Sequence, residues 1–194
     1  MADVTVEFPT EADEQLHAAV HRVLAGVVEV GGAVGWLHVP DESESAGWLD
    51  AELALAAAGR AGFAVVLYDG QVEALGLWAR YSAPVVAQNA EVRKVMTHPS
   101  AQGRGLARVL MRSLVEHARA HGVEMLSLDV RGNNHGAQAM YESLGWQRSG
   151  VIPDFIAVGD QRWDRVFYYL ELQRPAGVRL LGSEPTGPGA SDRR

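Results

Sequence analysis

The stretch that decides the fold begins with Val92-Arg93-Lys94-Val95-Met96-Thr97 and continues, after a short connection, into Gln102-Gly103-Arg104-Gly105-Leu106-Ala107. The first run is apolar at its centre, as in a strand, and the second is a glycine-rich turn that opens an amphipathic helix. A helix that starts directly after such a turn leaves backbone N–H groups unpaired at the positive end of its dipole. Gly103 and Gly105 have no Cβ, so an anion can approach the main chain closely. The stretch therefore predicts a pyrophosphate site.

Two common nucleotide motifs do not fit this turn. A P-loop requires G-x-x-x-x-G-K followed by Ser or Thr, and the dinucleotide fingerprint requires G-x-G-x-x-G with an acidic residue about twenty positions later. The sequence has neither at this turn. A tight strand-to-helix connection without any ligand remains the alternative explanation of the turn alone.

Three ordered motifs resemble the signatures of the GNAT superfamily of N-acetyltransferases. Gln102, Gly105 and Ala107 match its acetyl-CoA motif, Q/R-x-x-G-x-G/A. The downstream run from Asn134 to Trp146 is similar to N-x-x-A-x-x-L/F-Y-x-x-x-G-F/W, and the upstream run 91–99 resembles the central strand of that family. The resemblance covers roughly residues 61–172. It implies an α/β fold with a mixed, mostly antiparallel sheet, splayed at the central strand and flanked by helices.

Composition limits the remaining possibilities. The chain has 194 residues, 47% hydrophobic and 21% charged, which suits one globular domain. It has no cysteine, so thiolate metal sites and a cysteine nucleophile are excluded, and the histidines show no metal-ligand spacing. We therefore expect no metal. The formal net charge of −7 argues against a nucleic-acid partner and mildly favours a cationic substrate. Without a long apolar run or a secretory signal pattern, we expect a cytoplasmic protein that does not enter a membrane.

The expected elements follow the hydrophobic pattern. Thr10 caps a first helix that ends near Glu29, and Ser43 or Ser45 caps a second that ends near Gly59. Further helices are expected at 106–121 and 134–144, and strands at 63–68, 72–79, 92–97, 123–130, 146–150 and 163–172. We expect a single domain over residues 1–174 and a mobile tail rich in Gly and Pro over residues 175–194.

The resemblance implies which residues hold acetyl-CoA. The pyrophosphate would lie on the main chain of the turn, and Arg104 and Arg108 are candidates for additional charge. The pantetheine arm would pair with the central strand like an extra strand, with the N–H of Met96 polarising the thioester carbonyl. Asn134 would contact the same arm and also cap its own helix, although Asn133 is a rival for the cap. The predicted cofactor-binding residues are Val95, Met96, Thr97, Gln102, Gly103, Arg104, Gly105, Leu106, Ala107 and Asn134.

Two residues are the predicted catalytic groups. Tyr141 lies seven residues after Asn134, where the family places a tyrosine that protonates the leaving thiolate. Glu91 lies eleven residues before Gln102, at the offset of a catalytic glutamate in one branch of the family, and would deprotonate the amine. Packing of Tyr141, and an ion pair between Glu91 and Arg93 or Lys94, are the structural alternatives. Asp129 is a second candidate base. We expect His98 to face solvent.

The acceptor is the least determined feature. The runs 30–35 and 152–162 resemble the tabtoxin-resistance type of acetyltransferase, which implies a small amine with amino-acid-like character. Acetyl transfer to a protein or peptide is an alternative, and a sensor that binds acetyl-CoA without turnover is another. For Trp36 and Trp48 two roles stay open, a wall of the acceptor pocket and ordinary packing. A homodimer through the C-terminal strands is compatible with the sequence.

Overall fold

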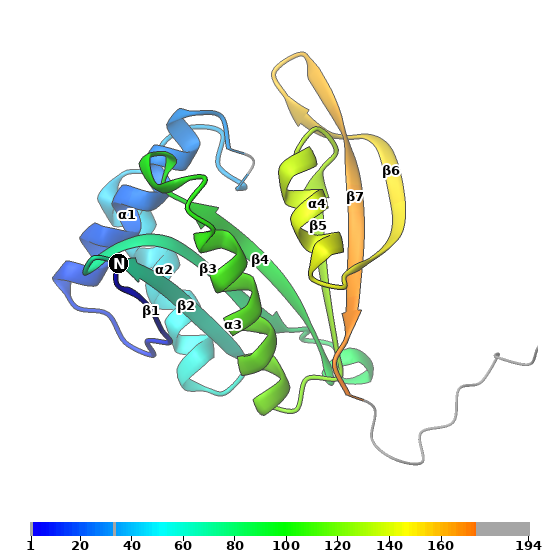
Figure 1. Cartoon of the computed structure of the whole chain (residues 1–194), viewed down its shortest axis with the longest axis horizontal. Helices are drawn as coiled ribbons and strands as arrows, with labels where there is room; N and C mark the ends of the chain where they lie inside the picture. Colours follow the sequence, from blue (N-terminus) through cyan, green and yellow to red (C-terminus); the bar gives the residue numbers. More distant parts are fainter. Residues whose placement is uncertain (1, 33, 174–194) are drawn as a thin grey trace, which may run out of the picture.

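A computed structural model describes residues 2–32 and 34–173, and within them one seven-stranded sheet runs through the molecule in the order β1-β2-β3-β4-β5-β7-β6 (Figure 1). Every pairing is antiparallel except that of β4 with β5. This confirms the predicted mixed, mostly antiparallel sheet. The strands are β1 (Val4–Glu7), β2 (Ala61–Tyr68), β3 (Gln71–Arg80), β4 (Asn89–Thr97), β5 (Met125–Arg131), β6 (Gln147–Val158) and β7 (Gln161–Glu171).

Helices cover both faces of the sheet. α3 and α4 contribute to a core that includes Leu110, Leu114 and Tyr141, whereas α1 and α2 pack on the opposite face around Leu24 and Leu49. Burial of these apolar side chains stabilises both layers. The helices are α1 (Glu14–Glu29), α2 (Glu42–Ala57), α3 (Leu106–Ala120) and α4 (His135–Ser143), with short 3-10 turns at η1 (Pro84–Val86) and η2 (Pro99–Ala101).

The first two helices begin at residues other than those predicted. The side chain of Asp13, not Thr10, caps α1 by accepting from the Leu16 N–H at 2.8 Å. Asp41 caps α2 by accepting from the Glu44 N–H. The Glu44 side chain accepts in turn from the Asp41 N–H, which completes a capping box. Each stretch holds several residues able to cap a helix, so the pattern alone did not decide between them.

The central strand separates from its neighbour. β4 pairs with β5 as far as Glu91 and Ser127, and the two strands then continue apart (Figure 1). On its other edge β4 has an irregularity opposite Gly76, where Lys94 takes a left-handed φ of 57°. Such a bulge adds a residue and bends the strand, and it coincides here with the separation. The predicted splay is therefore confirmed.

The C-terminal strands differ most from the prediction. β6 extends to Val158 instead of ending near Gly150, and a tight connection joins it to β7, so the expected loop 152–163 is a hairpin. β1 was not predicted. The expected tail, residues 175–194, lies outside the described residues. None of the described helices is long and apolar enough to cross a membrane.

Candidate active site

The turn between η2 and α3 presents a row of main-chain donors. Gly103 and Gly105 have φ values of 79° and 80°, a conformation that side-chain-bearing residues rarely adopt. Gly105 is the N-cap of α3 and provides no side-chain hydrogen bond to the helix. The N–H groups from Gly103 to Ala107 make no hydrogen bond within the described chain beyond the turn itself. Free main-chain donors and left-handed glycines at a helix start are the features that an anion cradle requires, and the pyrophosphate site itself stays a prediction.

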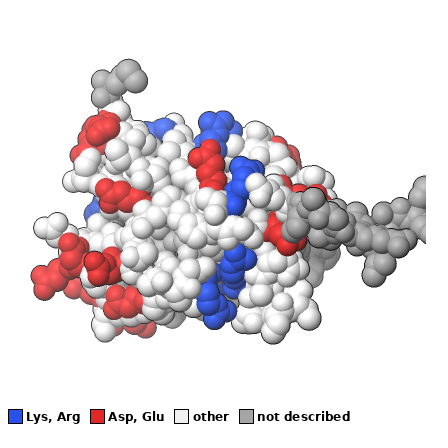
Figure 2. Space-filling view, turned by 90° about the horizontal axis from the view of Figure 1, so that it is seen from below, with Lys and Arg blue, Asp and Glu red and all other residues white. Residues whose placement is uncertain are grey.

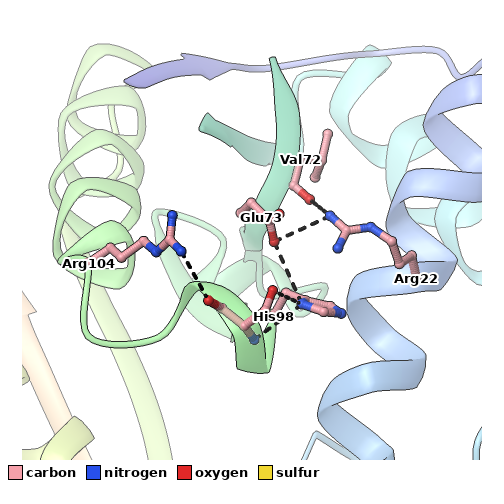
Figure 3. A network of polar contacts seen from close by, with 6 residues as sticks. Arg22, Val72, Glu73, His98 and Arg104 are labelled. Carbon is pink, nitrogen blue, oxygen red and sulfur yellow. Dashed lines mark hydrogen bonds and ion pairs between the residues drawn. The ribbon is translucent and has the colours of Figure 1, made fainter. Parts of the chain in front are cut away.

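Residues beneath this turn form a polar network (Figure 3). The buried Glu73 lies 3.3 Å from Arg22 of α1 and 3.8 Å from His98 Nδ1. The same His98 nitrogen is 2.8 Å from the Ser100 hydroxyl, and the His98 ring lies against Gly26. His98 is therefore half-buried and structural, and the prediction that it faces solvent is wrong. The reason is that α1 packs closely over the start of the turn.

Arg104, a predicted phosphate ligand, has structural partners as well. Its guanidinium lies over the Tyr68 ring, 4.7 Å from the centroid, and one Nη donates to the Ser100 carbonyl at 3.5 Å (Figure 3). These contacts hold the arginine beside the turn, with donors remaining for an anion.

The open edge of β4 offers two further donors. The His98 N–H donates to the Glu73 carbonyl of β3 at 2.8 Å. Because N–H groups alternate between the two edges of a strand, the Met96 N–H also faces β3, whereas those of Val95 and Thr97 face the side that β5 has left. This geometry corrects the choice of Met96 as the donor to a thioester and favours Val95 and Thr97. The Thr97 hydroxyl is buried and has no hydrogen-bond partner among the described residues.

Glu91 lies at the point where β4 and β5 separate. It makes no ion pair with Arg93 or Lys94, because Arg93 pairs with Glu52 at 2.6 Å and Lys94 donates to a main-chain carbonyl. Burial, and secondarily the charge of Asp129, raise the pKa of Glu91 above its ordinary value, with Arg93 and Arg165 opposing. The pKa of a carboxylate general base that works near neutral pH is shifted in this direction.

Tyr141 lies in the core on the α3 and α4 side of the sheet. Its side chain is 6% exposed and packs between Trp146 and Tyr168, and its hydroxyl makes no hydrogen bond with the described residues. Burial, then the charge of Asp129, raises the pKa of Tyr141 to about 12. The charge of Asp129 thus contributes to the raised pKa of both Tyr141 and Glu91.

Asp129 has a partner that the sequence analysis missed. Arg165 of β7 donates to Asp129 Oδ1 at 2.6 Å, and its guanidinium lies between the Phe155 and Phe167 rings. The two residues are 36 positions apart and meet through the β5–β7 register, which no local motif reveals. Because Arg165 already occupies Asp129 Oδ1, Asp129 is a poorer candidate base than Glu91.

A groove of about 440 Å³ opens beside Glu91 and Asp129. Hydrogen-bonded Tyr81 and Ser127, whose oxygens are 2.5 Å apart, line one part of it. The remaining lining residues are Glu91, Met125, Leu128, Asp129, Ser149, Phe167, Tyr168 and Tyr169. The volume suits a small ligand, and the two carboxylates make the groove favourable for a cation.

Asn134 is the N-cap of α4, accepting from the Ala137 N–H at 3.2 Å. Asn133 instead accepts from Arg131 Nε at 2.7 Å, which excludes it as the cap.

In residues 2–32 and 34–173 no three His, Asp or Glu side chains are grouped to hold a metal ion. On the face where α3 ends, Lys and Arg form a narrow band beside acidic groups (Figure 2).

Comparisons with known proteins agree with this geometry. The model of the acetyltransferase (GNAT) family matches residues 33–146, more than half of the chain. The ribosomal protein bS18-alanine N-acetyltransferase of Escherichia coli strain K12 is 32% identical over 88 residues, which cover 45% of this chain and 60% of that protein.

Two solved structures share the fold. The yncA protein of Salmonella typhimurium, solved with acetyl-CoA, has a TM-score of 0.76 at 23% identity, covering 89% of this chain and 96% of that one. A phosphinothricin acetyltransferase from Sinorhizobium meliloti, solved with acetyl-CoA, has a TM-score of 0.75 at 16% identity, covering 94% and 96%. With the family match over residues 33–146, the chain belongs to the acetyltransferase (GNAT) family.

Proposed function

We propose that this protein is an N-acetyltransferase that moves the acetyl group of acetyl-CoA to a small primary amine by direct attack in a ternary complex. One observation carries the proposal: β4 and β5 separate directly after Glu91 and Ser127. The separation leaves main-chain donors of β4 free beside the glycine-rich turn, with an acid and a base at its apex. No covalent acyl-enzyme is required, and the absence of cysteine agrees with that.

Acetyl-CoA would bind along this opening. The pyrophosphate would lie on the amides of Gly103 to Ala107, where the helix dipole of α3 adds favourable charge. The pantetheine arm would take the place of a strand beside Val95 and Thr97, whose N–H groups face the opening. One of these donors would hydrogen-bond to the thioester oxygen and stabilise the negative charge that develops on it. Asn134 would lie near the arm from the start of α4.

Glu91 would accept the proton of the attacking ammonium, directly or through a water. Its raised pKa makes it a stronger base than an exposed glutamate, and it has no competing ion pair among the described residues. The amine nitrogen then attacks the thioester carbon and the C–N bond forms. The nitrogen loses its second proton to solvent, and the C–S bond breaks as the CoA thiolate departs and takes a proton from solvent. The net products are an amide, CoA and the proton held by Glu91.

Tyr141 would act on the departing thiolate as a hydrogen-bond donor. With a pKa of about 12 the phenol is protonated at any physiological pH. An alkyl thiol has a pKa of about 8.5, so complete proton transfer from Tyr141 to the thiolate would be uphill by roughly 5 kcal/mol. The magnitudes therefore favour stabilisation of the thiolate by a hydrogen bond, with solvent supplying the final proton.

Two features support a small amine as the acceptor. The groove of about 440 Å³ has the volume of a small-ligand site, and its Glu91 and Asp129 carboxylates favour an ammonium group. The test is thiol release from acetyl-CoA with amino acids, polyamines, aminoglycosides, β-lactam toxin analogues and peptides, together with calorimetric titration of acetyl-CoA. Release with a small amine supports the proposal. Tight acetyl-CoA binding without release from any acceptor would favour the sensor alternative, and no binding would overturn the proposal.

A peptide or protein acceptor is the second candidate. The observation that favours it is the 32% identity to an enzyme named for the alanine of ribosomal protein bS18. The same panel separates the two candidates, because a peptide enzyme would turn over peptides with a free N-terminus faster than the corresponding free amino acids.

A further inference from the structure

Lys94 is the only lysine in the sequence, and its backbone conformation is unusual. Its φ of 57° is a left-handed value that residues with long side chains rarely adopt. Such conformations persist where the surrounding structure holds them, often beside functional sites. Lys94 lies in the bulge of β4, between the proposed base and the proposed thioester donors.

The bulge turns the Lys94 side chain toward the face that also carries Arg93. In a regular strand neighbouring side chains point to opposite faces, and an extra residue removes that alternation. The Lys94 ammonium donates to the Val34 carbonyl at 2.5 Å and lies 3.9 Å from the centroid of the Trp36 ring. The ammonium also packs closely against Gly35, where an added Cβ would lie only 2.6 Å from Lys94 Nζ.

Trp36 is linked back to β4 through α2. Its ring meets Trp48 edge to face, with centroids 5.4 Å apart. Trp48 Nε1 donates to Glu52 at 3.1 Å, and Glu52 accepts from Arg93 at 2.6 Å. The chain of contacts therefore begins and ends at the adjacent residues Arg93 and Lys94. We call its two tryptophans, Trp36 and Trp48, the indole wall.

The indole wall packs against the core on the α1 and α2 side of the sheet, the face to which Glu91 and Arg93 also point. Glu91 and Arg93 alternate with Ala90 and Val92, which are buried in the core under α3, so both point to the opposite face. The Lys94 ammonium is partly desolvated, and this burial, then the charge of Arg93, lowers the pKa of Lys94. In such a position hydrogen bonds and cation–π contacts are strong.

We infer that Lys94 is a positioning residue for the acceptor, whose ammonium fixes the indole wall on the face of the sheet to which Glu91 points. The expected change in acceptor KM rests on the proposed function. The structural part, that Lys94 holds Val34 and Trp36, rests on the contacts above. Lys94 itself takes no part in the chemistry. Its loss frees Val34 and Trp36, so the acceptor is held less well, while the binding of acetyl-CoA at the turn is unaffected.

Two variants separate the side chain from the backbone. Lys94→Asn removes the cation but suits the left-handed conformation, and Lys94→Arg keeps the cation. We expect the acceptor KM of Lys94→Asn to rise roughly 5- to 30-fold, as the loss of a cation–π contact and a charged hydrogen bond implies, with the Kd of acetyl-CoA unchanged. Lys94→Arg retains most of the acceptor affinity. An unchanged acceptor KM in Lys94→Asn would overturn the inference.

A second readout needs no turnover. Because the chain has one lysine, acetylation of its side chain by an N-hydroxysuccinimide ester reports on Lys94 alone when peptides are separated by mass spectrometry. We expect slow labelling in the wild type and at least about 10-fold faster labelling in Trp36→Leu, because the indole shields the amine. Equal rates would overturn the inference. If the wild type neither binds acetyl-CoA nor releases thiol, the proposed function fails, and the labelling rates still decide whether Lys94 holds the wall.

Discussion

Glu91 and Ser127 form the last pair between the only two parallel neighbours in the described sheet, and the proposed chemistry lies where that pairing stops. A strand that loses its neighbour exposes main-chain donors, and exposed donors bind an extended ligand arm as another strand would. Tyr141 lies in the core on one face of the sheet, and the charge of Asp129 contributes to its raised pKa. One irregularity in the sheet would thus provide the donors for the proposed binding of acetyl-CoA and place the proposed base at its apex.

Replacement of Glu91 tests the base. Glu91→Gln keeps the size and removes the proton acceptor, so kcat should fall by roughly 10²- to 10⁴-fold while the Kd of acetyl-CoA is retained. Initial rates of thiol release and calorimetry measure the two quantities. Because the pKa of Glu91 is raised, kcat of the wild type should drop on acidification at a pH above that of an ordinary glutamate. A mutant with a wild-type pH–rate profile would transfer the role to Asp129 or to water.

Replacement of Tyr141 tests the hydrogen bond to the thiolate. Tyr141→Phe keeps the packing against Trp146 and Tyr168 and removes a hydroxyl without partners, so the thermal midpoint should change little. We expect kcat to fall about 10²-fold, as for the loss of one preorganised donor to a developing anion. A kcat equal to that of the wild type would show that the thiolate leaves without help from this residue.

The glycine turn can be tested with a matched strain control. Gly105→Glu places a carboxylate on the anion cradle and should abolish acetyl-CoA binding in calorimetry. Gly122, at φ 69° after the end of α3, has equally open surroundings, so Gly122→Ala carries similar backbone strain of about 1 kcal/mol away from the site. We expect Gly122→Ala to bind acetyl-CoA normally. Unchanged affinity in Gly105→Glu would reject the pyrophosphate assignment.

Stability should depend on pH through His117. Burial, then the charge of His121, lowers the pKa of His117 from 6.5 to about 4. Its Nδ1 accepts from Trp78 Nε1 at 3.1 Å, which requires the neutral ring. Between pH 6.5 and 4 the unfolded chain therefore binds more protons than the folded one, so the free energy of unfolding falls as the pH is lowered through this window.

Urea unfolding at several pH values measures this dependence. His117→Gln leaves an acceptor for Trp78 but does not titrate, so its free energy of unfolding should fall less steeply between pH 6.5 and 4. His38→Gln, which removes an exposed imidazole, serves as the control and should retain the wild-type slope. Equal slopes in the wild type and His117→Gln would contradict the assignment.

Candidate site residues can be predicted from the sequence where a position requires one residue type locally. Gly105 needs a left-handed φ, and Asn134 needs a short acceptor side chain at a helix start, so both are visible in the printed letters. Tyr141 was predicted from its spacing after Asn134, and Glu91 from its spacing before Gln102. The splay followed from the family resemblance and not from any residue pattern.

Other features depend on contacts that no short pattern encodes. The extension of β6 was missed because this edge strand is exposed almost throughout and has no alternation of buried and exposed residues. Arg165 meets Asp129 only through the register of two distant strands. Lys94 points to the same face as Arg93 because of a bulge, whereas regular alternation would place the two on opposite faces. The predictions of the helix caps were wrong for a simpler reason, because neighbouring residues such as Thr10 and Asp13 are equally able to cap a helix.

The most direct test follows the acetyl group itself. The wild type and Glu91→Gln are incubated with acetyl-CoA that carries a deuterated acetyl group and with each acceptor of the panel, and the acceptors are analysed by mass spectrometry. The proposed function predicts labelled N-acetyl product from a small amine in the wild type, formed at least about 100-fold more slowly in Glu91→Gln. Labelled product on no acceptor, from wild-type protein that binds acetyl-CoA, would contradict the assignment of acetyl transfer to this site.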